Sequence, residues 1–131
     1  MNVEVFSLCD AATDSHGKLN ILGVFDTIYS QKIPSAHPQC AIAIRLRLAR
    51  SEGGDHKFAI QLVDQDGAAI MPAMEGNFGI NFDETARVSA TVNLILYIHN
   101  LQLKNYGDCA INLVVDGRHE AALPWYIKPA G

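Results

Sequence analysis

The sequence predicts an all-β protein, and three observations support this fold class. Large apolar residues alternate with polar or small ones in several segments, and Gly, Pro and Asp separate those segments. No window carries an apolar stripe of helical period. We therefore expect about eight strands in a two-sheet antiparallel β-sandwich with Greek-key or immunoglobulin-like connections, formed by one domain, 1–131. A closed β-barrel is the alternative.

The strands follow from the alternation in chain order. The clearest strand covers residues 41–48, where large aliphatic side chains occupy every even position. The same pattern predicts strands at 58–62, 88–98 and 108–115. The dipeptide Asp116-Gly117 suits a type I′ turn, so residues 118–127 are expected to return as a hairpin strand.

The remaining segments are assigned with less regular patterns. Residues 3–8 predict a first strand and 19–29 a long second strand, in which Gly23 marks a bulge or a close backbone approach. Loops are expected at 10–17 and 33–39. A short helical turn is expected at 83–86, because Asp83 can accept hydrogen bonds from free backbone N–H groups.

Composition restricts the classes of function. Charged residues make up 18% of the chain and apolar residues 49%, so the protein has either a large core or an apolar surface kept for a partner. The net charge is −4 and no basic run occurs, which argues against nucleic-acid binding. No segment is long and apolar enough for a membrane span. The chain starts without a secretory signal pattern, and its three cysteines are odd in number, so we expect a cytoplasmic protein with free thiols.

Two stretches resemble a known family. Residues 8–11 (Leu-Cys-Asp-Ala) and 17–26 (Gly-Lys-Leu-Asn-Ile-Leu-Gly-Val-Phe-Asp) are similar to the opening of a family of short, uncharacterised bacterial proteins. Members tend to end with a Gly-x-aromatic-x-apolar strand that runs into Val-Asp-Gly. Here that strand is residues 107–117, and Cys109 stands where an aromatic residue is commoner. The resemblance implies a β-sandwich-like fold and carries no activity with it.

Two segments contain residue types that bind metal ions. Asp64, Asp66 and Glu75 match three positions of a calcium loop, but Gly67 lies at the wrong position for such a loop. A polar β-turn is the preferred interpretation. His37 and Cys40 offer zinc-ligand chemistry without the paired spacing that structural zinc sites use. We therefore predict no metal, no cofactor and no catalytic residues.

Nucleophilic catalysis also lacks a motif. Cys9 followed by Asp10 is better explained as a strand-end thiol than as a nucleophile. Neither a Gly-x-Ser-x-Gly elbow nor a phosphate-binding Gly-rich loop occurs. The sequence therefore predicts that the protein is not an enzyme.

Four apolar residues are candidate interface residues. Trp125 and Tyr126 are adjacent, so on a strand they face opposite sides and one of them faces solvent or a partner. Ile95 and Tyr97 lie on the otherwise polar face of their strand. Exposed aromatic and aliphatic residues are common anchors of interfaces. We expect a protein partner or a second copy of the chain, giving a homo-oligomer.

The sequence thus favours a non-enzymatic β-sandwich interaction module that self-associates or docks on another protein. The alternative is a small-ligand, carbohydrate or calcium binder that uses loops at one end of the sandwich. The first candidates for that alternative are Asp10, Asp14, Asp64 and Asp66.

Overall fold

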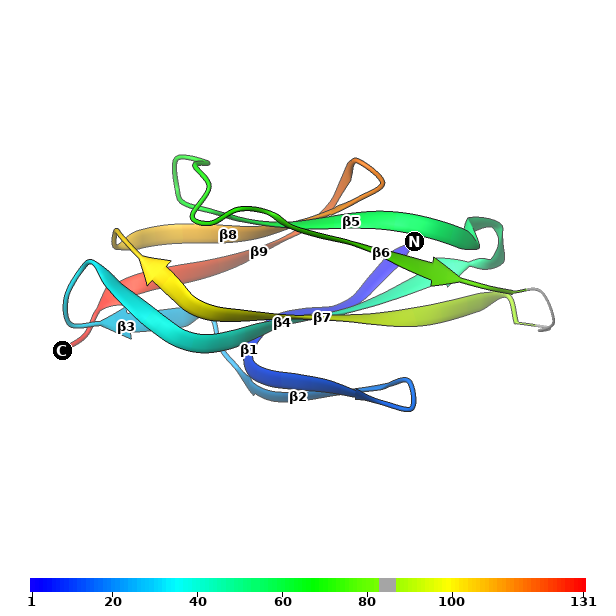
Figure 1. Ribbon diagram of the computed structural model, residues 1–131, viewed down its shortest axis with the longest axis horizontal. Helices are drawn as coiled ribbons and strands as arrows, with labels where there is room; N and C mark the ends of the chain where they lie inside the picture. The colour runs from blue at the N-terminus through cyan, green and yellow to red at the C-terminus, as the bar shows by residue number, and fades with distance from the viewer. Residues whose placement is uncertain (83–86) are drawn as a thin grey trace.

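In the computed structural model, which describes residues 1–82 and 87–131, two β-sheets face each other (Figure 1). In spatial order, the first sheet consists of β2 (Lys18–Val24), β1 (Asn2–Ser15), β4 (Ser35–Ala49) and β7 (Ser89–Leu103). The second sheet consists of β3 (Thr27–Ser30), β9 (Arg118–Pro129), β8 (Gly107–Val115), β5 (Gly54–Val63) and β6 (Met74–Ile80). A short 3-10 turn, η1 (Arg50–Glu52), joins β4 to β5. The predicted β-sandwich is confirmed, and both sheets have open edges, so the fold is not a closed barrel.

The core lies between the two sheets, where the alternating residues of the predicted strands meet. Ile42 and Ile44 of β4 and Ile111 of β8 are completely buried. Burying an aliphatic side chain of this size stabilises a fold by about 1.5–3 kcal/mol. Period-two alternation therefore identified the inward faces of the central strands correctly.

The predicted second strand, 19–29, is wrong as one element. The chain leaves the first sheet after Val24 and enters the second at Thr27, where β3 pairs in parallel with β9. Gly23 has a φ of +70°, and a Cβ there would lie 2.9 Å from the carboxyl carbon of Asp10. The register between β1 and β2 runs through Gly23 without a shift, so the strand has no bulge there; the close approach at Gly23 is made by the Asp10 side chain, and β2 ends one residue further on.

The two predicted loops are also partly wrong. Residues 10–15 continue β1 as one arm of a hairpin, whose turn is formed by His16 and Gly17, both with positive φ. Polar side chains concealed this extension because one side of the hairpin faces solvent. Likewise β4 begins at Ser35, and it tolerates Pro38 because β1 pairs with β4 only from Ala41 onward. A proline there removes no hydrogen bond to a second neighbour.

The hairpin at Asp116 and Gly117 is confirmed: both residues have positive φ, and β8 and β9 pair antiparallel on either side. The helical turn expected at 83–86 lies outside the described residues. The described chain contains no helix of the length and apolar character that a bilayer crossing requires.

Candidate functional site

The outer face of the first sheet is covered by the chain itself. Beyond Cys9 the β1–β2 hairpin leaves the plane of β4 and lies as a further layer below it (Figure 1). A second, smaller apolar cluster fills the space between the hairpin and the sheet, made of Cys9, Ala12, Leu19, Ile21, Ala41, Ala43 and Ile95. The two alanines on β4 leave room for this layer.

Polar contacts hold the hairpin against the sheet. The Tyr97 hydroxyl donates to the Ala12 carbonyl oxygen at 2.6 Å and accepts from the Ala12 N–H at 3.1 Å. Asn93 donates to the Asp14 carboxylate at 2.9 Å and to the Gly17 carbonyl at 3.1 Å. The Asn93 amide holds the pKa of Asp14 below its usual value, with the Gly17 N–H as a further donor.

A charged cluster lies beside the hairpin on the same face. Glu4 accepts from the Nε atoms of Arg45 and Arg47 at 3.1 and 2.6 Å. The hydrogen bond from Arg47 lowers the pKa of Glu4. Arg45 also donates to the Gly17 carbonyl oxygen and to the Asn93 side chain, so its guanidinium group connects the hairpin, β1 and β7.

The structure places the four candidate interface residues in different environments. Trp125 is completely buried between the sheets. Ile95 belongs to the small outer cluster, and Tyr97, 41% exposed, holds the hairpin. Tyr126 lies on β9 of the second sheet, where it pairs with Asp108 of β8. The Lys128 ammonium group lies over the Tyr126 ring, 5.5 Å from the ring centre. The four residues therefore do not form one surface, although Ile95 and Tyr97 share strand β7.

Strand β7 presents a long open edge. It pairs with β4 over its whole length, and no other described strand pairs with it. Its fifteen residues include no Asp, Glu, Lys, Arg, Pro or Gly. Such edges attract further strands, and proteins usually protect them with charges, prolines, bulges or short length.

The other edge strands carry this protection in the part of the chain that is described. β2 contains Lys18 and the positive-φ residue Gly23, and β6 contains Glu75 and two glycines. β3 has four residues. Among the described edge strands, β7 therefore combines the greatest length with an absence of charge, and its residues 89–99 contain no positive-φ residue.

A half-buried apolar strip accompanies the β7 edge. β6 and β7 are edge strands of opposite sheets and contact each other. Val92 and Leu96 of β7, with Met74 and Ile80 of β6, pack on the core and remain partly exposed. The open side of the sandwich thus combines free backbone groups with apolar side chains.

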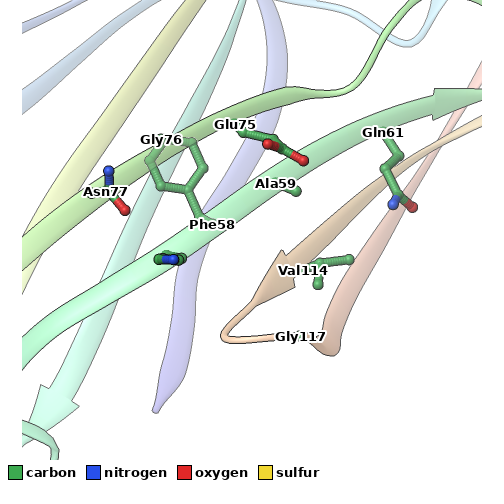
Figure 2. Close-up of a pocket in the computed structure, with 9 residues that line it drawn as sticks. Phe58, Ala59, Gln61, Glu75, Gly76, Asn77, Val114 and Gly117 are labelled. Atoms are coloured by element: carbon green, nitrogen blue, oxygen red, sulfur yellow. The ribbon is translucent and has the colours of Figure 1, made fainter.

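The outer face of the second sheet contains a hollow of about 540 Å³ (Figure 2). Ala59 and Val114 contribute small apolar side chains to it, and the Phe58 ring lies directly against Gly76, where a Cβ would be 2.7 Å from the ring. Gln61 and Asn77 also line the hollow, and their amides bond to no other described side chain. The hollow can therefore offer hydrogen bonds to a small polar molecule.

Next to this hollow, His56 forms a network that sequence reasoning missed. Its Nδ1 lies 2.6 Å from the Asp116 carboxylate and its Nε2 lies 2.6 Å from the Glu52 carbonyl oxygen. Both partners are hydrogen-bond acceptors, so this geometry favours the cationic ring, in which both nitrogens donate. Asp116 raises the pKa of His56, and His56 in turn lowers that of Asp116. Asp116 was noticed only as a turn residue, and nothing local in the sequence places it beside His56.

The network continues to the chain terminus. Glu52 pairs with the Met1 amino group at 2.8 Å, and this hydrogen bond lowers the pKa of Glu52. The ring of His56 also stacks on Phe78, with centres 5.2 Å apart. Because both ring nitrogens of His56 are hydrogen-bonded, this network connects the chain terminus, η1, β5 and the β8–β9 turn.

The calcium-loop pattern is a turn in the structure. One Asp64 carboxylate oxygen accepts from the N–H groups of Asp66 and Ala68, each at 2.9 Å. Asp10 and Asp14 lie on the β1–β2 hairpin, while Asp64 and Asp66 lie between β5 and β6. Among residues 1–82 and 87–131, no three metal-ligating side chains come together.

The cysteines are buried thiols. Cys9 donates to the Ala41 carbonyl at 3.5 Å, and burial raises its pKa. Burial raises the pKa of Cys40 and of Cys109 to about 11. These thiols are therefore protonated and poor nucleophiles at neutral pH.

The fold and its surfaces define a two-sheet β-sandwich with one long, uncharged open edge. A family model matches residues 4–128, and the chain belongs to that family, the family of unknown function DUF6941. The family resemblance seen in the sequence is thereby confirmed. Asp10 and Gly23 of its opening motif lie close together, so a side chain larger than that of Gly23 would meet the Asp10 carboxyl group.

Comparisons with curated sequences and solved structures give no further identification. No curated protein sequence matches the chain. One solved structure with similarity is the alkylpurine DNA glycosylase AlkC of Pseudomonas fluorescens, bound to DNA containing an abasic site analog. The match has a TM-score of 0.48 and 11% identity, and it covers 79% of this chain and 28% of the glycosylase chain. This likeness carries no functional information.

Proposed function

We propose that this protein is a non-enzymatic interaction module that binds a protein partner through the open edge of β7. The observation that carries the proposal is the fifteen-residue edge strand without charge, proline or glycine. An added strand would satisfy its free N–H and C=O groups, and its neighbouring side chains would supply specificity. The half-buried Val92 and Leu96 would become fully buried in such a complex.

The absence of an enzymatic role is part of the same proposal. The histidine with the most polar contacts, His56, has both nitrogens occupied by acceptors. The three cysteines are buried and protonated at neutral pH. These side chains stabilise the fold and are not available as catalytic bases or nucleophiles, which supports an interaction role in the cytoplasm.

A peptide selection tests the interaction role directly. A library of displayed short peptides is selected on the immobilised protein, and the bound peptides are then titrated while backbone amide signals are followed. We expect extended, uncharged peptides whose binding protects β7 amides from exchange. The edges of β2, β3 and β6 serve as internal controls. Peptides that bind at those edges, or no selected peptides, would contradict the proposal.

The hollow on the second sheet supports a second candidate function. Its free amides at Gln61 and Asn77, above the small side chain of Ala59, suit a polar, hydroxyl-rich small molecule. Thermal unfolding with a panel of mono- and disaccharides tests this function. A rise in midpoint that disappears in Asn77→Ala supports it, and unchanged midpoints with every sugar count against it.

A further inference from the structure

The regular part of β7 limits which strand can be added to it. Asn100 has a φ of +54°, so the extended conformation is interrupted there. Residues 89–99 form the uninterrupted edge, with odd-numbered side chains on the outer face and even-numbered ones towards the core. A partner strand, in either direction, therefore needs to pair over about eleven residues and to be uncharged on both faces.

A second copy of this same segment meets these requirements. We propose that β7 pairs antiparallel with β7 of a second copy about a two-fold axis, so that the first sheet continues across two protomers. This proposal rests on the proposed function and names its partner. Two-fold pairing of identical strands is isologous, which closes the assembly at a dimer.

Symmetry decides which residues meet. Full overlap of residues 89–99 with the copy places Leu94 on the axis. Val92 then faces the copy's Leu96 on the core side, so the apolar layer is continuous between protomers. On the outer face Thr91 meets the copy's Tyr97, a β-branched and aromatic pair of the kind that stabilises sheets.

The absence of charge is what makes self-pairing favourable. Charged residues close to a two-fold axis face their own copies or one another, and like charges directly opposite destabilise a sheet. The segment 89–99 has no such residue. The charges on the outer face belong to other strands: Glu4 compensates Arg45 and Arg47. The Asp14 carboxylate and the Arg45 guanidinium both bond to the Asn93 amide, so opposite charges also lie together beside the proposed axis.

The size of the contact suits a weak, reversible dimer. Eleven residues at about 3.4 Å each give an edge roughly 37 Å long. An edge of a two-layer sandwich is roughly 15 Å high, since the sheets lie about 10 Å apart and side chains project beyond them. The product, about 550 Å² per protomer and about 1,100 Å² in total, lies just below the size of stable interfaces and within that of weak, reversible ones.

Light scattering behind size exclusion, combined with amide exchange of β7, tests the pairing. We expect a mass of twice 14.3 kDa at high concentration and dissociation on dilution. In the dimer consecutive amides of residues 90–98 are protected, whereas in a monomer only the alternate amides bonded to β4 are protected. A monomer at every concentration overturns the pairing, as does a dimer in which β7 exchange still alternates.

A charge-swap pair gives the matched control. In the proposed register Ser89 faces the copy's His99. The double variant S89E/H99E therefore places like charges opposite each other at both ends, while S89E/H99K places opposite charges there. We expect the first variant to weaken dimerisation at least about tenfold and the second to keep it. Equal effects of the two variants would overturn the pairing.

Both variants are first compared with the parent protein by urea unfolding at low concentration, so that a folding defect is recognised. If the chain is monomeric and peptides still bind at β7, self-pairing fails while the interaction function stands. If neither occurs, both proposals fail.

Discussion

Tyr97 offers the sharpest test of how the β1–β2 hairpin is held. Removing its hydroxyl in Tyr97→Phe leaves the Ala12 N–H and carbonyl without their partner. β4 pairs with β1 only as far as Cys9, so no strand replaces the lost contacts. Ala12 is 4% exposed, and water reaches these groups poorly.

The expected loss follows from the two hydrogen bonds. Each contributes about 0.5–1.5 kcal/mol net, and leaving a buried backbone group unpaired costs about 1–3 kcal/mol. Because Tyr97 is 41% exposed, partial rehydration keeps the total near the lower end, and we expect a loss of about 1–2 kcal/mol.

Urea unfolding measures this loss as a lower midpoint at an unchanged slope. Exchange of the hairpin amides is expected to accelerate more than that of the central β4 amides. Tyr29→Phe is the control, since Tyr29 is 65% exposed and its hydroxyl bonds to no described residue. If both variants unfold at the parent's midpoint, the two hydrogen bonds of Tyr97 do not stabilise the hairpin, and the reasoning is wrong.

Three further predictions concern other parts of the fold. Gly23→Ala is expected to destabilise by about 1–3 kcal/mol because of its positive φ, plus the contact with Asp10. Gly17→Ala, with similar φ and open space around it, is the control in urea unfolding, and an equal loss in both would exclude the Asp10 contact. The His56–Asp116 pair makes stability depend on pH: the raised pKa of His56 means that its contribution is complete below about pH 6.5 and is lost as the pH rises through the folded pKa. The lowered pKa of Asp116 means that its contribution is present above about pH 3.9 and is lost as the pH falls through its folded pKa. Unfolding of His56→Gln from pH 4 to 9 should therefore show a smaller decrease of stability on the alkaline side than the parent. A pH profile identical to that of the parent would refute the role of the pair. Finally, the thiols of Cys9, Cys40 and Cys109 should resist a thiol reagent at pH 8 until denaturant is added, and rapid labelling of the native protein would contradict their burial.

The sequence by itself determined the fold class and the inward faces of the central strands. Period-two alternation is a local property of an extended chain, so residues 41–48 and 108–115 reveal their buried sides without any tertiary information. The Asp116-Gly117 hairpin is equally local, because two consecutive positive φ values depend on the residues of the turn.

Only the tertiary structure decided what covers the outer faces. Ile95 and Tyr97 read as exposed apolar residues because the sequence does not show that the hairpin folds back over them. In the sequence Trp125 and Tyr126 are equivalent aromatic neighbours, and the register between β8 and β9 decides which of them is buried. A one-residue shift of that register would exchange the two faces.

The open edge was decided in the same way. The lack of charge in residues 89–103 is visible in the sequence, but it is equally compatible with a central strand. The spatial order of the strands makes β7 the last strand of its sheet. Strand order depends on long-range pairing, since neighbours such as β4 and β7 are separated by two strands of the other sheet, and local patterns do not encode that choice.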